Sequence, residues 1–124
     1  MKLNFEDERP IFLQIAQEIE QSILVGAYQE EEQVPSTTEI SLTYKINPAT
    51  ALKGVNRLVE EGILYKRRGV GMFVAKGAVQ LVREKRKGAF YQQYVTSLTR
   101  EAKRLNLTSG EIIQLIERSY RESD

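Results

Sequence analysis

The sequence predicts a mostly helical α+β fold: a winged helix-turn-helix domain over residues 1–76, then a short two-helix tail over residues 77–124. Three observations support this prediction. Apolar residues recur at helical spacing along most of the chain, which indicates amphipathic helices. Only Ile46-Asn47 separates two of these helical patterns, as in a helix-turn-helix. After Gly62 the period changes to two short strand-like runs, which predicts a β-hairpin.

Composition argues against several classes of function. The chain has no cysteine and no histidine, so it lacks disulfides, thiolate metal ligands and the commonest general base. We therefore expect no metal, no cofactor and no enzymatic activity, and we assign the pair Glu60-Glu61 to a solvated helix end. Apolar runs are too short to cross a bilayer, and residues 1–10 lack the apolar segment of a signal peptide. We expect a cytoplasmic protein without a membrane partner.

The first helix is expected to begin at Pro10, because a missing N–H costs nothing at the first helical position. Four isoleucines spaced four residues apart form its core-facing stripe: Ile11, Ile15, Ile19 and Ile23. The helix should end near Gly26, with Tyr28 closing over its end. The acidic segment 28–35 that follows is expected to be a loop.

Ser36 and Glu39 have the spacing of a capping box, in which the hydroxyl and the carboxylate each accept a free backbone N–H. This pair predicts a short second helix over residues 37–45. The residues that it should bury are Ile40 and either Tyr44 or Leu42.

The third helix should begin at Pro48, because Asn47 is a good N-cap and proline is favoured at the first helical position. At 100° per residue, one side is predicted to be buried: Ala51, Leu52, Val55, Leu58 and Val59. The opposite side carries small, hydroxyl and cationic groups: Ala49, Thr50, Lys53 and Arg57. Such a side suits a DNA major groove, because small residues permit close approach and cations meet phosphates or guanine edges. A solvated side without a partner is the alternative.

The hairpin is expected to carry a basic tip. Its strand-like runs, 63–65 and 72–74, flank Lys66-Arg67-Arg68 and the turn-forming Gly69-Val70-Gly71. A hairpin that follows a helix-turn-helix is a wing, and its basic tip can contact phosphates or an adjacent minor groove. The charge is segregated in the same sense: residues 1–44 carry −7, residues 45–88 carry +8 and residues 89–124 carry 0. We expect a cationic surface that faces a polyanion.

The tail is expected to make a dimer. A helix from Ala78 to about residue 105 carries an apolar seam with spacings of 4, 3, 4 and 3: Tyr91, Val95, Leu98, Ala102 and Leu105. Thr108 and Glu111 form a second capping box, with Leu107 and Ile112 as a hydrophobic staple. The last helix then carries Ile112, Ile113, Ile116 and Tyr120. A tail of this size cannot enclose a sizeable core alone, so a second copy should complete it. Packing on the N-terminal core is the alternative, and Gly88 is a candidate kink.

Four segments of the sequence resemble the GntR family of bacterial transcription regulators, over about residues 10–75. In chain order they are "PIFLQIAQEIEQSILVGAY", "VPSTTEIS", "NPATALKGVNRLVEEGIL" and "RRGVGMFV". The short tail and the Asn47-Pro48 start are similar to the YtrA-type subfamily. The resemblance implies a winged helix-turn-helix dimer that binds a palindromic operator, usually represses, and lacks a large ligand-binding domain. YtrA-like members often control adjacent transporter operons, and the resemblance implies the same role here.

Residues from the second helix, the third helix and the wing are predicted to contact DNA. They are Ser36, Thr38, Lys45, Asn47, Pro48, Ala49, Thr50, Lys53, Arg57, Lys66, Arg67, Arg68, Gly69 and Gly71. By the resemblance, residues 47–50 match the start of the family's recognition helix, and Arg68-Gly69 match its wing-tip contact. Thr38 and Leu52 stand where the family often has a cation, and Met72 replaces the wing's threonine.

Two recognition helices related by a two-fold axis would enter successive major grooves, about 34 Å apart. Whether Lys53 meets a phosphate or a guanine stays open. A winged helix that binds only protein is a second hypothesis, which the basic surface argues against. Whether an unidentified small-molecule effector binds between the tail helices also stays open; such a ligand would shift the two recognition helices apart.

Overall fold

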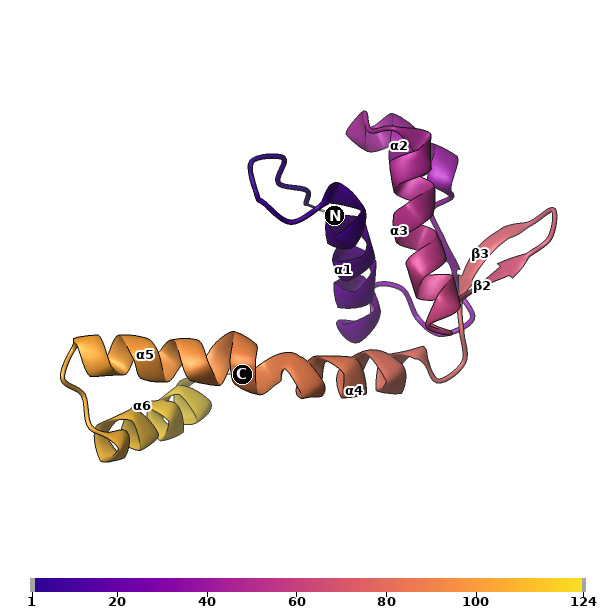
Figure 1. The fold of residues 1–124 in the computed structure, drawn as a ribbon. Helices are drawn as coiled ribbons and strands as arrows, with labels where there is room; N and C mark the ends of the chain where they lie inside the picture. Colours follow the sequence, from indigo (N-terminus) through magenta and orange to yellow (C-terminus); the bar gives the residue numbers. More distant parts are fainter. Residues whose placement is uncertain (1, 124) are drawn as a thin grey trace. The chain divides into compact units, whose positions relative to one another are not determined.

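The computed structural model describes residues 2–123. Its contacts divide the chain into two compact units, residues 1–84 and 85–124. The first unit holds three helices, a three-stranded sheet and the first turns of a fourth helix. The second unit holds the rest of that helix and the C-terminal helices. The mostly helical winged fold that the sequence predicts is therefore confirmed (Figure 1).

Helix α1 spans Ile11–Leu24 and supplies the isoleucines at the centre of the core. It begins one residue later than predicted, because Pro10 is the N-cap: its carbonyl accepts the N–H groups of Leu13 and Gln14 at 3.1 and 3.2 Å. At the other end Gly26 has φ +83°, and the next two N–H groups donate to the Ser22 carbonyl. This left-handed residue ends the helix as the sequence predicts.

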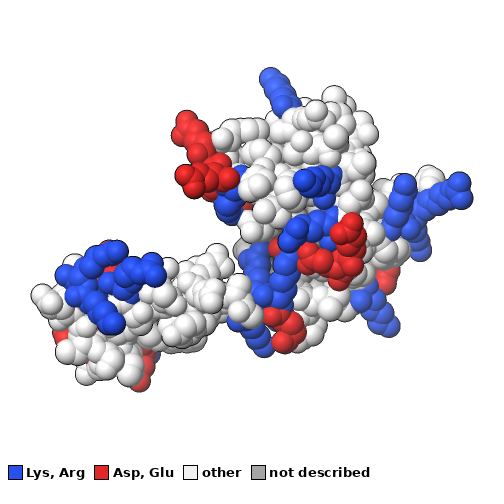
Figure 2. All heavy atoms as spheres, in the orientation of Figure 1, with Lys and Arg blue, Asp and Glu red and all other residues white. Residues whose placement is uncertain are grey.

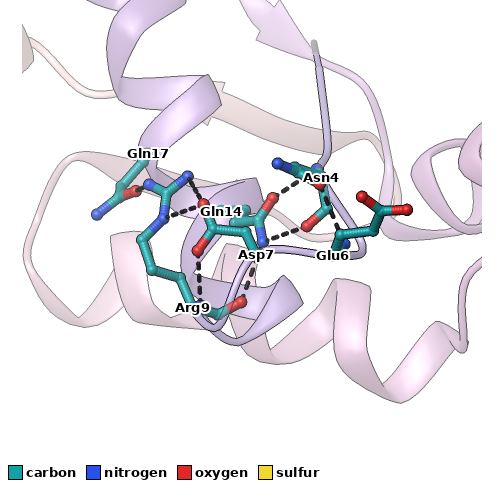
Figure 3. Close-up of polar contacts among 6 residues, drawn as sticks. All are labelled: Asn4, Glu6, Asp7, Arg9, Gln14 and Gln17. Atoms are coloured by element: carbon teal, nitrogen blue, oxygen red, sulfur yellow. Dashed lines mark hydrogen bonds and ion pairs between the residues drawn. The ribbon is translucent and has the colours of Figure 1, made fainter.

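The segment before α1 lies against it through the buried amide of Gln14, which is 3% exposed. Figure 3 shows this amide bound at both ends: its oxygen accepts the Asn4 N–H at 2.7 Å, and its nitrogen donates to the carbonyls of Asn4 and Arg9 at 2.9 and 3.0 Å. Arg9 forms an ion pair with Asp7 at 2.9 Å, and this guanidinium lowers the pKa of the Asp7 carboxyl. These contacts hold residues 4–9 over the start of α1.

Helix α2 spans Thr37–Tyr44 and begins with the predicted capping box. The Ser36 hydroxyl accepts the Glu39 N–H at 3.0 Å, and the Glu39 carboxylate accepts the Ser36 N–H at 3.2 Å. Ile40 is buried, whereas Leu42 is 74% exposed. Tyr44 packs against the core, so α2 contributes Tyr44, and not Leu42, to the core beside Ile40.

Helix α3 spans Pro48–Glu60 and begins as predicted, with the Asn47 side-chain oxygen accepting the Ala49 N–H at 2.7 Å. The prediction that Leu52 is buried is wrong, because the side chain is 47% exposed. The buried arc instead includes Gly54, where α1 approaches so closely that an added Cβ would lie 2.7 Å from the Phe12 carbonyl oxygen. Burial of the glycine side of the helix moves Leu52 to its exposed edge.

Strands β2 (Leu64–Arg67) and β3 (Gly71–Val74) form the predicted wing, which projects beyond α3 in Figure 1. They pair antiparallel, with Tyr65 opposite Phe73. A third strand, β1 (Gln33–Val34), pairs with the other edge of β3, giving the order β1-β3-β2. This segment was expected to be a loop; two residues are too few to show an alternating pattern in the sequence.

The second unit contains the continuation of one long irregular helix, followed by a shorter one. Helix α4 (Ala78–Phe90) continues through a π-helical turn, Tyr91–Val95, into α5 (Thr96–Arg104). The irregularity therefore lies at residues 91–95, three residues beyond the Gly88 that was considered as a kink. Helix α6 spans Ser109–Glu122 and begins with the predicted capping box of Thr108 and Glu111. The first turns of α4 belong to the first unit, because Ala78 and Val82 are buried in its core.

Candidate nucleic-acid interface

The exposed side of α3 contains both apolar and cationic side chains. Pro48, Ala49, Leu52, Lys53 and Arg57 are all exposed, whereas Thr50 is half-buried. The buried side holds the helix on the core through Ala51, Val55 and Leu58, each 1% exposed or less. We call Pro48, Ala49, Leu52, Lys53 and Arg57 the α3 face. It has the mixture of small groups and cations that a helix needs to enter a major groove.

Each of the two cations of the α3 face has a partner beside it. The ammonium of Lys53 lies 4.1 Å from the centre of the Phe12 ring on α1. The guanidinium of Arg57 is 3.5 Å from the Glu61 carboxylate, one turn further along the chain. An aromatic ring holds a cation without neutralising it, whereas an exposed carboxylate competes with a phosphate for it.

An aromatic pair supports the base of the wing. Phe73 stacks on Tyr65 with ring centres 5.8 Å apart, and the Arg67 guanidinium lies 4.9 Å from the Phe73 ring centre. The Tyr65 hydroxyl donates to the Glu31 carboxylate at 2.6 Å, and this hydrogen bond raises the pKa of Tyr65. The wing is thus connected through side chains to the loop that precedes β1.

The tip of the wing is a tight turn between β2 and β3. The Val70 N–H donates to the Arg67 carbonyl at 3.0 Å, and Gly69 between them has φ +77°. Gln33 of β1 donates from its side-chain nitrogen to the Val70 carbonyl at 3.1 Å. Gly71 has φ +146°, and a Cβ there would lie 2.4 Å from that Gln33 nitrogen. Glycine at residue 71 therefore permits the contact that holds the tip.

The wing carries three consecutive cations, Lys66, Arg67 and Arg68, all exposed. Figure 2 shows basic atoms covering the projecting hairpin at the right of the view. Three adjacent positive charges on a hydrogen-bonded hairpin attract a phosphate backbone with a strength that falls as salt rises.

The remaining predicted contact residues lie at the ends of α2 and in the turn to α3. The Ser36 hydroxyl caps α2, and Thr38 on its first turn is exposed. Lys45 is exposed. Its backbone adopts a left-handed conformation, with φ 54°, at the C-terminal end of α2. Asn47 is exposed, but its side-chain oxygen is occupied by the cap of α3.

Three supporting residues, Phe12, Glu31 and Gln33, were not identified from the sequence. Each contacts the α3 face or the wing across at least 34 positions of chain: Phe12 to Lys53, Glu31 to Tyr65 and Gln33 to Val70. Local spacing carries no signal for such contacts. An aromatic residue among the aliphatic residues of α1 is the only hint at Phe12.

The residues predicted for dimerisation are mostly exposed in the second unit. Tyr91, Leu98, Leu105, Ile113, Ile116 and Tyr120 are 40–81% exposed, while Val95 and Ile112 are half-buried. Ala102 is 5% exposed, so the tail itself buries it. Within residues 2–123 no group of acidic side chains could hold a metal ion, and no helix has the length and apolar character to cross a membrane.

The fold and the α3 face with its wing define a class: a winged helix-turn-helix transcription regulator that binds DNA. Residues 12–74 match the bacterial regulatory proteins of the gntR family. This match covers half of the chain, so the chain belongs to the GntR family.

Solved structures and curated relatives agree with this assignment. A GntR-family regulator from Bacteroides thetaiotaomicron has a TM-score of 0.72 and 32% identity, with 92% of this chain and 99% of that chain covered. The DNA-binding domain of AraR, in complex with operator ORX1, has a TM-score of 0.56 and 26% identity, covering 60% and 96%.

The chain is also similar to the transcriptional repressor YtrA of Bacillus subtilis, with 32% identity over 69 residues. The aligned part covers 56% of this chain and 53% of that repressor. The chain is thus a YtrA-like member of the family.

Proposed function

We propose that this GntR-family regulator is a homodimeric repressor that binds an inverted-repeat operator through the α3 face and the wing of each copy. The observation that supports this most is the pairing of an exposed helix side with an exposed basic hairpin. The α3 face provides approach to base edges, and Lys66, Arg67 and Arg68 provide contacts to phosphates. AraR, whose DNA-binding domain has the same fold, is seen on operator DNA.

The dimer is supported by the tail. Six large apolar side chains of the predicted seams are 40% or more exposed, on a unit of only 40 residues. Where exposed apolar side chains form one contiguous patch, they mark an interaction surface. A second copy would bury them and would give the complex the two-fold symmetry that an inverted repeat requires.

Repression is supported by the relatives, since YtrA of Bacillus subtilis is a transcriptional repressor. A protein on an operator beside a promoter blocks the polymerase without any catalytic step. We extend the proposal to control of a nearby transporter operon, the role that the family resemblance implies. Transcript levels of the neighbouring operon in a deletion strain test that extension: they should rise without the regulator.

Selection of DNA fragments from a genomic digest with the purified full chain tests the proposal. A repressor of this type should enrich a few fragments that share an inverted repeat with half-sites about one helical turn apart. A variant with Lys66, Arg67 and Arg68 all replaced by alanine serves as the matched control and should lose the enrichment. If the wild-type chain enriches no shared sequence, the proposal is wrong.

A further inference from the structure

Three apolar residues are exposed near the start of α3. Pro48, Ala49 and Leu52 are exposed, and Leu52 lies one turn after Ala49, so their side chains are neighbours on the helix. A single exposed leucine on a protein surface needs no explanation. Here the leucine extends an apolar strip at the end of the helix that enters the groove.

Three of the polar residues beside this strip have partners within the chain. The side-chain oxygen of Asn47 accepts the Ala49 N–H at 2.7 Å. The Lys53 ammonium lies over the Phe12 ring at 4.1 Å, and Arg57 pairs with Glu61 at 3.5 Å. The guanine edge is usually recognised by a bidentate cation. At Pro48, Ala49 and Leu52, the start of α3 offers carbon atoms instead.

In the major groove, the group that distinguishes a base pair by an apolar contact is the C5-methyl of thymine. We propose that Leu52 contacts this methyl group and makes the protein specific for a T·A pair in each operator half-site. The inference rests on the proposed function, because it requires α3 to enter the major groove. Ala49, one turn earlier, leaves space for the methyl beside the leucine.

Replacement of thymine by deoxyuridine tests the contact, because it removes the methyl and changes no Watson–Crick hydrogen bond. The full chain first selects duplexes from a random library. Each thymine of the selected duplex is then replaced in turn, and Kd is measured by fluorescence anisotropy. One thymine per half-site should show a loss of about fourfold, the equivalent of one buried methyl. Replacement in both half-sites should give about fifteenfold.

Leu52→Ala should bind the thymine and deoxyuridine duplexes equally, because the side chain that meets the methyl is gone. Leu42→Ala is the matched control: Leu42 is 74% exposed on α2, and this variant should keep the fourfold difference. Both leucines are exposed, so neither substitution removes core packing.

Two results overturn the inference while the proposed function stands: specific binding that ignores deoxyuridine at every position, or an undiminished deoxyuridine effect in Leu52→Ala. A selection that enriches no sequence is a different result. It overturns the proposed function, and the inference with it.

Discussion

The cations of the α3 face and of the base of the wing have two kinds of neighbour, an aromatic ring or a carboxylate. Lys53 and Arg67 lie over the rings of Phe12 and Phe73, contacts worth about 0.5–1 kcal/mol at exposed sites. These rings orient the cations and leave their charge available to phosphates. Arg57 is paired with the carboxylate of Glu61, the C-cap of α3, so a contact with a DNA phosphate would require Arg57 to exchange one anion for another. An exposed pair of this kind is weak, and the exchange costs little.

Replacement of Arg68 by alanine should weaken operator binding and its dependence on salt. Arg68 stands at the wing tip beside Gly69 and is exposed. Loss of one phosphate contact per copy should reduce the slope of log Kd against log salt by about 0.9 for each chain of the dimer. Titrations between low and moderate salt measure this slope.

Arg100→Ala removes the same charge from an exposed position of α5 and is the control. It should leave the slope as in the wild type. An Arg68→Ala slope equal to that of the control would remove Arg68 from the interface.

The elements are positioned by a close approach of α1 to α3 at Gly54. An added Cβ there would lie 2.7 Å from the Phe12 carbonyl oxygen and 3.1 Å from Ile15. The same approach places the Phe12 ring under Lys53. The packing of the two helices and the orientation of the α3 face therefore depend on one residue without a side chain.

Gly54→Ala should destabilise the first unit. Overpacking against backbone costs about 1–3 kcal/mol, which exceeds the gain of up to about 1 kcal/mol that alanine gives a helix. Thermal unfolding followed by circular dichroism measures the change. Gly88→Ala is the control of opposite sign: an added Cβ there meets nothing within 4 Å, so the substitution should stabilise its helix. A Gly54→Ala variant as stable as the wild type would contradict the close contact.

The start of α4 is capped by a carboxylate from a distant loop. The Glu30 carboxylate accepts the N–H groups of Gly77 and Val79 at 2.9 and 3.2 Å. These bonds, first that of Gly77, lower the pKa of Glu30 from its ordinary 4.5. Because the folded pKa is the lower one, the stabilisation is complete above pH 4.5 and is lost as pH falls through the folded value.

Glu30→Gln should therefore be less stable than the wild type at neutral pH, with a smaller difference at pH 3. Urea unfolding midpoints at the two pH values measure this difference in stability. Glu117→Gln, at an exposed position of α6, is the control. Its difference in stability from the wild type should be the same at both pH values. A difference for Glu30→Gln that is equal at both pH values would show that the ionised carboxylate is not responsible.

Local signals predicted the elements well, and contacts distant in sequence were missed. The caps at Ser36, Asn47 and Thr108 involve neighbours in sequence, and all three are confirmed. The exposure of Leu52 and the pairing of Gln33 with β3 depend on α1 and on the wing, which lie far away in sequence. Periodicity assigns a helix its apolar side, but the edge of that side depends on which neighbour comes close.

At the scale of the whole molecule, the proposed function requires two copies. Each chain has one α3 face, and an inverted repeat has two half-sites. The tail exposes several large apolar side chains within residues 85–123, including Leu98 at 40% and Tyr120 at 81%. A dimer through this surface would couple two binding units, so that the second contact becomes intramolecular and affinity increases.

Leu98→Glu should convert the dimer to a monomer, because it places a charge in the proposed interface. Sedimentation equilibrium measures the mass, and operator affinity should fall with it. Thr99→Glu changes the adjacent exposed residue, off the apolar seam, and should remain dimeric. A monomeric wild type, or a Leu98→Glu variant that stays dimeric, would contradict the tail interface.

The most direct test of the account is the operator affinity of Ala49→Glu. A carboxylate in the first turn of a helix is favourable for the fold, while on the α3 face it would repel the DNA. Gln29→Glu adds the same charge to the exposed acidic loop and is the control. For Ala49→Glu we predict unchanged thermal stability and a loss of specific binding by at least about a hundredfold. For Gln29→Glu we predict an affinity near that of the wild type. Equal operator affinity for Ala49→Glu and the wild type would contradict the account.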